Sequence, residues 1–324
     1  PKFRKLAPAD YQSQGKTDRL VGFVDFAPTV LSLAGIKPPQ HMQGDAFMGQ
    51  YDTKPQEYLF GFRGRMDERY DLVRSVRNQR YLYIKNYMPH KKYGQYLNYM
   101  FQTPTTQVWK KMYDAGELKP PQTYFWETKP AEELYDLQAD RDEVNNLADS
   151  AEHQAVLTEL KQAQHKKILA IRDLGFLPEA EFHSLADGGA PYLVGQNKEL
   201  YPLRQILKMA DLASSGKPSG VGQLIKGLSS QNAAIRYWAA MGLLMRGEPA
   251  VAQAHESLQK ALEDSSKSVR CIAAEALGRY GTQQDIDDAV DTLISLSDQK
   301  REGVYVAMLA LNGLDKLGSE KVAR

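Results

Sequence analysis

The hydrophobic pattern of the last third of the chain repeats itself. Residues 224–247 (LIKGLSSQNAAIRYWAAMGLLMRG) align without gaps on residues 258–281 (LQKALEDSSKSVRCIAAEALGRYG) at an offset of 34 residues, and a looser third copy follows at a shift of 37. In the second half of a copy, apolar residues recur at i, i+3, i+4, i+7 and i+8, which places them on one stripe of a helix. One such set is Val269, Ile272, Ala273, Ala276 and Leu277. Helix pairs repeated at this period, with Gly at the stop, predict an α-solenoid.

Shorter apolar and aromatic runs fill the preceding part of the chain. Several are rich in Tyr, Val, Leu and Ile and have the length of strands. Two of them flank Asn78-Gln79 and predict an antiparallel hairpin. A helical pattern from Ser150 to Leu174 would cover one face of the resulting sheet. The four expected strands are residues 57–62, 71–77, 80–87 and 133–137.

The first apolar run, residues 20–24, predicts a strand that passes into a short helix. Asp25 is placed to cap that helix, Pro28 suits its first turn, and Gly35 ends it. The expected buried face of the helix is Val30, Leu31 and Ala34. Together these elements predict one edge of an α/β layer.

Residues 86–130 form an aromatic, Pro-containing segment with little periodicity. Loops of this length are uncommon in compact domains and are often functional. A packed surface excursion explains the segment equally well. The residues alone leave both interpretations open.

Composition excludes several classes of protein. The 41 basic and 40 acidic residues cancel to a net charge of +1, so no overall field favours nucleic acid or an acidic membrane. The longest apolar stretches, such as VLSLAGI, are far shorter than the roughly 20 residues that span a bilayer. Cys271 is the only cysteine, so an internal disulfide and a thiolate metal cluster are excluded, and a small buried side chain is expected.

The chain lacks the usual spacing signatures of catalysis. Its six histidines show no metal-ligand spacing, and no nucleophile elbow, phosphate-binding loop or dinucleotide turn is present. One short stretch, FGFRGRMDER, concentrates Arg63, Arg65 and Arg69 around Asp67 and Glu68. These arginines either bind an anion or form exposed ion pairs, which contribute only about 0 to 1 kcal/mol each.

Three segments resemble motifs of the type I sulfatases of the alkaline phosphatase superfamily. GFVDFAPTVLSLAGI, residues 22–36, is similar to the family's V-D-x-x-P-T segment. VRSVRNQRYLYIKNY, residues 73–87, resembles its C-terminal hairpin, and EELYDLQADRDEVNNLAD, residues 132–149, resembles the segment that closes its small sheet. The likeness covers roughly residues 1–185 and is closest to bacterial heparan N-sulfatase-like members that carry HEAT repeats.

The resemblance implies an α+β fold with three parts. Residues 1–50 would be the tail of the α/β sulfatase core, and residues 51–190 the antiparallel-sheet subdomain with its packed helix. Residues 191–324 would be HEAT-like repeats. The first residues, PKFRKLAP, and the last, KVAR, are expected to be the ends of a fragment of a longer protein.

The resemblance also implies which chemistry lies elsewhere. Family members convert a Cys or Ser in C-x-P-S-R or C-x-A-S-R to formylglycine and bind calcium beside it. Neither motif occurs, and Cys271 is followed by Ile272 and Ala273. No catalytic or metal-binding residue is therefore assigned. We expect a fragment that hydrolyses no sulfate ester alone and whose intact form is periplasmic or extracellular.

FGFRGRMDER occupies the place where family members approach the active-site mouth. Guanidinium groups offer charged bidentate donors suited to sulfate, so Arg63 and Arg65 are the expected contacts to a sulfated carbohydrate. Asp67 and Glu68 would accept sugar hydroxyls or orient the arginines. The hairpin arginines, Arg74, Arg77 and Arg80, are expected to be structural.

Two other functions remain open. The chain could be a non-catalytic scaffold that binds a protein partner through the concave face of its repeats. It could also belong to a phosphoryl-transfer enzyme of the same superfamily, although such an enzyme would not readily share all three motifs.

Overall fold

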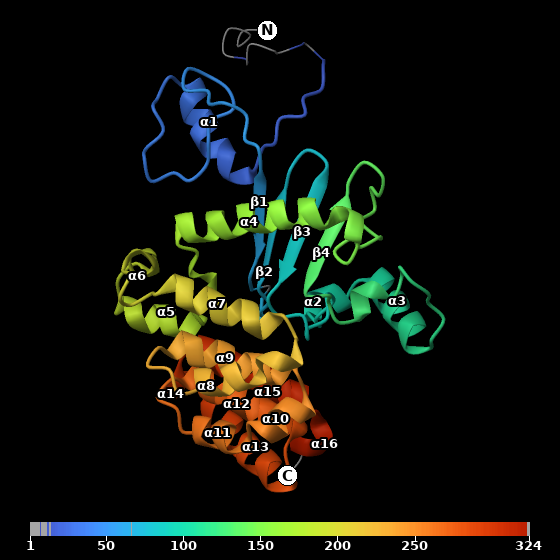
Figure 1. Ribbon diagram of the computed structural model, residues 1–324, viewed down its shortest axis with the longest axis vertical. Helices are drawn as coiled ribbons and strands as arrows, with labels where there is room; N and C mark the ends of the chain where they lie inside the picture. Colours follow the sequence, from blue (N-terminus) through green and yellow to red (C-terminus); the bar gives the residue numbers. More distant parts are fainter. Residues whose placement is uncertain (1–6, 8–11, 13, 66, 323–324) are drawn as a thin grey trace. The chain divides into compact units, whose positions relative to one another are not determined.

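The computed structural model describes residues 7, 12, 14–65 and 67–322 as a largely helical chain with a small sheet (Figure 1). The chain forms two compact units, which it visits alternately. The first unit contains the residues up to Phe62, Arg74–Lys85 and Glu132–His165, and the second contains Arg63–Val73, Asn86–Ala131 and the residues from Lys166 onward. These units do not coincide with the expected boundaries at residues 50 and 190, which stay a prediction.

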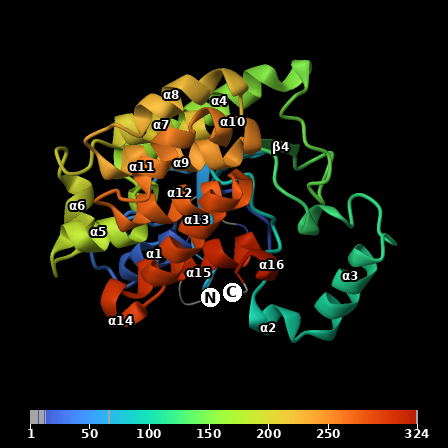
Figure 2. The ribbon, with the colours of Figure 1, turned by 90° about the horizontal axis from the view of Figure 1, so that it is seen from below.

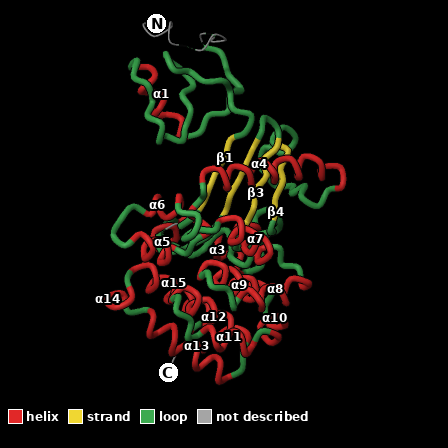
Figure 3. Tube along the Cα trace, turned by 60° about the vertical axis from the view of Figure 1, so that its left-hand side comes forward, coloured by secondary structure: helices red, strands yellow, loops and turns green. Residues whose placement is uncertain are grey.

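The sheet has four antiparallel strands, as the sequence predicted, and the strands lie in chain order (Figure 3). Alternation along the strands places Val76, Tyr83 and Leu134 on one buried face. Tyr83 lies opposite Leu134 in the register of the last two strands. The strands are β1 (Leu59–Arg63), β2 (Val73–Arg77), β3 (Tyr81–Asn86) and β4 (Glu132–Asp136).

Helix α4 (Gln154–Ile171) supplies the cover of this face, also as predicted. Its Leu157 and Leu160 are buried in one cluster with the sheet residues. At the helix flank, the Tyr58 hydroxyl donates a hydrogen bond to Glu159 at 2.9 Å. The sheet and the first part of α4 thus form the core of the first unit.

The expected strand at residues 20–24 is wrong. The chain there forms a short 3-10 turn, Phe23–Asp25, that leads into α1 (Phe26–Leu33). The Asp25 carboxylate accepts hydrogen bonds from the backbone N–H of Gly22 at 2.7 Å and of Asp45 at 2.8 Å. These bonds fold the backbone into a turn, so the apolar run cannot remain extended.

The expected buried face of α1 is also wrong. Val30 is 64% exposed, whereas Thr29 and Ser32 are buried. The Thr29 hydroxyl accepts a hydrogen bond from the N–H of Phe47, and the Ser32 hydroxyl accepts one from the N–H of Tyr51. The helix therefore packs its polar stripe on the backbone of a following loop, because that loop supplies donors which apolar side chains could not satisfy.

The second unit is built mainly from helix pairs (Figure 2). The two aligned copies fold as α8 with α9 and as α11 with α12, and the looser copy contributes α15. None of the helices in the described ranges is both long and apolar enough to cross a membrane. The helices are α5 (Glu179–Ala186), α6 (Pro191–Gln196), α7 (Leu203–Ser214), α8 (Val221–Gly227), α9 (Ala233–Met245), α10 (Glu248–Gln253), α11 (His255–Ala261), α12 (Lys267–Tyr280), α13 (Gln283–Leu296), α14 (Gln299–Glu302), α15 (Val304–Leu317) and α16 (Ser319–Val322).

Helix starts in the repeats are marked by capping side chains. The Asn232 side chain accepts hydrogen bonds from two N–H groups at the start of α9, and Ser266 accepts one from Val269 at the start of α12. Thr282 and Asp285 form a capping box at the start of α13. Each cap satisfies backbone donors that a helix leaves unpaired, so short polar residues fix where each repeat helix begins.

Helix α12 lies at the centre of the repeat core. The predicted stripe that includes Val269, Ile272 and Leu277 is buried in one cluster. On another side of the helix, Cys271 and Ala274 are buried against α13 and α15. Cys271 is buried, as the sequence predicted, and this burial raises the pKa of its thiol to about 12.

The segment from residue 86 to residue 130 is folded. It contains α2 (Asn98–Phe101), α3 (Pro104–Asp114) and a turn of 3-10 helix, Tyr124–Trp126. Trp126 is buried and has ring contacts with Trp109. The lack of periodicity in the sequence reflects an aromatic cluster that holds short helices together.

Candidate functional site

The arginine loop, defined here as Arg63–Asp71, follows β1 and belongs to the second unit. All three of its arginines are described, and their side chains differ in exposure. Arg63 is 35% exposed, Arg65 is 20% exposed and Arg69 is 12% exposed. The loop therefore does not present three equivalent cations to solvent.

Arg65 is held by α5 at the start of the helical part. Its Nε donates to Glu179 Oε1 at 3.0 Å, and its Nη2 donates to Glu179 Oε2. This bidentate pairing fixes the plane of the guanidinium group. A third hydrogen bond, from Nη1 to the carbonyl of Asp67 at 3.3 Å, ties the side chain to its own loop.

Arg69 is held by α15, which lies more than two hundred residues further along the chain. Its Nη1 donates to Asn312 Oδ1 at 2.6 Å and to Asp315 Oδ2 at 2.9 Å. Asn312 in turn donates from Nδ2 to the carbonyl of Glu68 at 2.7 Å. The repeat helix therefore binds both a side chain and the backbone of the arginine loop.

Arg63 lies beside a buried ion pair. Lys129 Nζ and Asp71 Oδ2 are 2.6 Å apart, and both side chains are fully buried. Arg63 Nη1 is 3.9 Å from the same Asp71 oxygen. A buried pair of this kind is costly to break, because either partner alone would be a buried unpaired charge.

The structure thus separates the four predicted recognition residues. Arg63 keeps the largest exposed fraction of the three arginines, whereas Arg65 is engaged by Glu179. Asp67 is exposed, has a positive φ of 45°, and uses its carbonyl to accept from Arg65. The assignment of these residues to substrate recognition stays a prediction. Sequence reasoning missed Glu179, Asn312 and Asp315.

A layer of ionisable side chains lies in the second unit near this loop. Burial lowers the pKa of Lys91 to about 8, and the carboxylate of Glu275 acts in the opposite direction. Burial also raises the pKa of the Glu275 carboxyl group. His90 has a pKa well below its ordinary value because of burial, with Lys91 adding to the effect. Asp71, Lys129 and Glu275 are buried, and His90 and Lys91 are half-buried beside them; we call these five side chains the buried charged layer.

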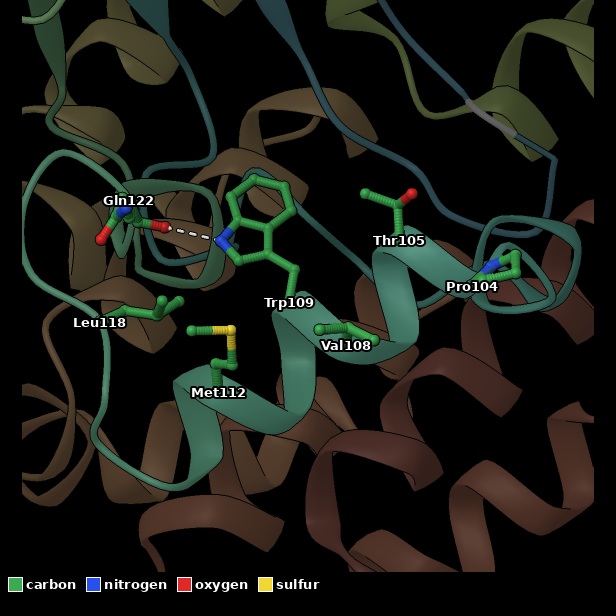
Figure 4. Close-up of a pocket in the computed structure, with 7 residues that line it drawn as sticks. All are labelled: Pro104, Thr105, Val108, Trp109, Met112, Leu118 and Gln122. Atoms are coloured by element: carbon green, nitrogen blue, oxygen red, sulfur yellow. Dashed lines mark hydrogen bonds between the residues drawn. The ribbon is translucent and has the colours of Figure 1, made fainter.

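An open groove on α3 is a contrasting feature (Figure 4). Its volume is about 480 Å³, and Val108, Met112 and Leu118 give it an apolar lining. Trp109 forms one wall, stacked on Phe125 at a centroid distance of 4.9 Å and donating from Nε1 to the carbonyl of Gln122 at 3.0 Å. The spacing of Thr105, Val108 and Met112 was the signal available in the sequence.

The described residues do not fit the calcium and formylglycine that the resemblance implies. No group of three or more His, Cys, Asp or Glu side chains in the described part is arranged to hold a metal ion. Cys271 is buried inside the repeat core. We therefore derive no catalytic step through either group.

The fold is that of a helix-rich protein with a small antiparallel sheet and repeated helix pairs. Comparisons with known proteins show which proteins share these parts. Residues 269–299, which cover most of α12 and all of α13, match the PBS lyase HEAT-like repeat. An ulvan-active sulfatase of Formosa agariphila is 39% identical over 175 residues, covering 54% of this chain and 29% of that protein. A second ulvan-active sulfatase of the same organism is 29% identical over 157 residues, covering 44% of this chain and 28% of that protein.

One solved structure is also similar in part. It is a complex of a protein with its substrate D-glucosamine-2-N,6-O-disulfate, at 19% identity and a TM-score of 0.28. The match covers 44% of this chain and 23% of that chain. A likeness this weak carries no argument about fold or ligand.

These findings show that the chain contains a sulfatase-like region together with a HEAT-like repeat. The resemblance read from the three sequence motifs is thereby confirmed. The chain spans 29% and 28% of the lengths of the two curated relatives.

Proposed function

We propose that this chain is the C-terminal part of a sulfatase that acts on a sulfated glycan, and that it contributes substrate recognition. The 39% identity to an ulvan-active sulfatase over 175 residues is the observation that carries the proposal. In the intact enzyme, formylglycine would supply the nucleophile and calcium would neutralise sulfate oxygens. The chain alone would be inactive because those groups lie in the remainder of the protein. The intact enzyme would be periplasmic or extracellular.

In this proposal the first unit includes an edge of the α/β catalytic core. The exposure of large apolar side chains around α1 supports that role. Phe23 is 92% exposed, and Phe26 and Val30 are also exposed. Exposed apolar groups gathered on one element are typical of a surface that another part of a protein covers.

The repeats are proposed to form an α-solenoid of the HEAT type whose task includes holding the arginine loop. The 34-residue sequence period and the match at residues 269–299 support this fold. The hydrogen bonds that Arg65 donates to Glu179 and that Arg69 donates to Asn312 support the task. Arg63, with the most exposed guanidinium, would contact a sulfate or carboxylate of the glycan directly.

The decisive experiment uses the longer protein that contains this chain. Arg63→Ala should raise KM for a sulfated oligosaccharide about tenfold, since a hydrogen bond to a charged group contributes roughly 1.5 to 3 kcal/mol. The same variant should change KM for a small aryl sulfate far less. Arg204→Ala, which alters an exposed arginine on α7, is the matched control. Equal effects of Arg63→Ala on both substrates would contradict a recognition role.

A non-catalytic scaffold is the second candidate, and the apolar groove on α3 favours it. An open apolar groove suits a protein segment better than a sulfated sugar. The gene sequence upstream distinguishes the two functions. A C-x-P-S-R or C-x-A-S-R motif there would support the sulfatase, whereas further helix pairs would support the scaffold.

A further inference from the structure

A small, partly open cavity lies within the second unit, and Arg65 and Tyr70 of the arginine loop contribute to its lining. Its volume is about 30 Å³, and its walls include Lys91, Tyr237, Ser268 and Asn312. A body the size of one or two water molecules fits such a space, whereas a sugar does not. Among its polar lining groups, Arg65 and Lys91 can only donate, whereas the Ser and Tyr hydroxyls and Asn312 can both donate and accept.

Ser268 is the first indication of a ligand. The residue is 0% exposed, and its hydroxyl has no hydrogen-bond partner among the described residues. Ser268 is the second residue of α12, a helix of 14 residues. The N-terminus of a helix carries a partial positive charge and unpaired N–H groups, both of which favour an anion.

Lys91 is the second, independent indication. An ammonium group has three donors, and Nζ of Lys91 makes one hydrogen bond, to the carbonyl of Tyr70 at 2.8 Å. Asp71 and Glu275 attract this charge, but Lys129 and Lys316 repel it. Asp71 is already bonded to Lys129, and Glu275 lies 3.5 Å from Arg279.

The charged groups at the other wall do not supply the missing acceptor. Glu179 lines the cavity, but both of its carboxylate oxygens accept from Arg65. The two side chains neutralise each other, so the positive charge of Lys91 is not balanced at this wall. Water would accept a hydrogen bond but would leave that charge unbalanced, whereas a small anion would do both.

We propose that this cavity is a binding site for a monovalent halide ion, chloride under ordinary conditions. The ion accepts hydrogen bonds from Lys91 Nζ and from the Ser268 hydroxyl at the N-terminus of α12. It thereby joins the base of the segment 86–131 to a repeat helix. The proposed halide site rests on this geometry alone, so it is independent of the proposed sulfatase function.

Crystals of the chain grown or soaked in bromide test the position directly. An anomalous peak in the cavity, within hydrogen-bond distance of Lys91 and Ser268, is the expected result. A water molecule without anomalous signal would overturn the proposal. A peak that needs molar bromide and has no counterpart in solution would mean binding at crystal concentration only, which also overturns it.

Thermal unfolding supplies the solution test. At constant ionic strength, replacing gluconate by chloride or bromide should raise the Tm of the wild-type chain. Lys91→Met should lose this halide-dependent rise, whatever its own Tm, and the matched control Lys92→Met on an exposed neighbour should keep it. A rise of equal size in Lys91→Met would contradict the site.

Ser268→Ala keeps the test decisive if Lys91→Met does not fold. Removal of one hydroxyl donor to an ion should raise the half-saturating bromide concentration about tenfold. The variant deletes only one oxygen from a fully buried position, so the helix should remain intact. An unchanged half-saturating concentration would show that Ser268 does not contact the ion.

Discussion

The buried charged layer and the α3 groove reverse the usual distribution of side chains. In the first, Asp71 and Lys129 are fully buried as an ion pair. In the second, Val108 is 59% exposed on the surface of a short helix. Apolar residues ordinarily fill the interior and charges the surface, so each of these regions needs a physical reason.

The two regions differ in how far the surrounding protein encloses their side chains. Buried charges persist only where partners are fixed around them, so the layer is expected to be rigid and intolerant of substitution. An exposed apolar groove has no such demand, so its residues are expected to contribute little to folding and to act in binding. Graded substitutions in the two regions test this contrast.

The largest effect is expected for Lys129→Met. The substitution leaves the buried carboxylate of Asp71 without its closest partner, at a cost of about 3 to 5 kcal/mol in unfolding free energy. Lys119→Met, at an exposed position, is the control and should be neutral. Denaturant unfolding measures both. A loss below about 1 kcal/mol for Lys129→Met would show that Arg63, 3.9 Å from Asp71, can replace the lysine.

The next effect is a pH dependence that originates at Lys91. Burial lowers its pKa from the ordinary 10.5 to about 8 in the folded protein. Between these two pH values the unfolded chain binds more protons, so the free energy of unfolding rises as pH rises and is level below pH 8. The total gain is on the order of 3 kcal/mol.

This dependence is measured as the difference between wild-type and Lys91→Met in halide-free buffer, which cancels the ionisation of tyrosines. A bound halide would keep Lys91 charged, so adding bromide should move the rise to higher pH. A flat difference between about pH 8 and 10.5 would show that Lys91 keeps its ordinary pKa.

A smaller effect is expected for Glu179→Ala, which removes the partner of Arg65. The loss should be about 1 to 3 kcal/mol, because the guanidinium is only 20% exposed. Hydrogen exchange should become faster in residues 67–71 of the arginine loop. Glu179→Gln, which keeps one acceptor oxygen, should recover part of the protection. Unchanged exchange in Glu179→Ala would mean that Arg69 alone holds the loop.

The smallest effect is expected in the α3 groove. Val108→Ser should change the unfolding free energy by no more than about 0.5 kcal/mol, since an exposed position lacks packed neighbours. The same substitution should lower the binding of an apolar fluorescent dye. A loss of several kcal/mol would show that the groove is part of the folding core and would remove the contrast between the two regions.

The elements that the sequence predicted correctly are those with a periodic pattern of hydrophobic residues. The four strands, α4 and the paired helices around Val269 and Leu277 follow from alternation and helical stripes, which are local patterns. The strand expected at residues 20–24 failed because a carboxylate, Asp25, bonds the backbone of a distant residue, Asp45. The prediction of the buried face of α1 was wrong for the same reason, since the buried Thr29 accepts a hydrogen bond from the distant N–H of Phe47.

The environment of the arginine loop could not be read from the sequence. Arg65 and Glu179 are separated by 114 residues, and Arg69 and Asn312 by 243. The local acids, Asp67 and Glu68, contribute their carbonyl groups to this network. No spacing rule links residues so far apart, so only the folded chain identifies the partners.

The alternation of the chain between its two units has a practical consequence for anyone who shortens the gene. Six segments contribute to the two units in turn, so no cut yields either one as an uninterrupted polypeptide. A truncation after residue 190 would delete Asn312 and Asp315, and Arg69 would keep only its hydrogen bond to the carbonyl of Tyr96. Loss of glycan binding by such a shortened protein could therefore result from a less firmly held arginine loop and would not show that sugar touches the repeats.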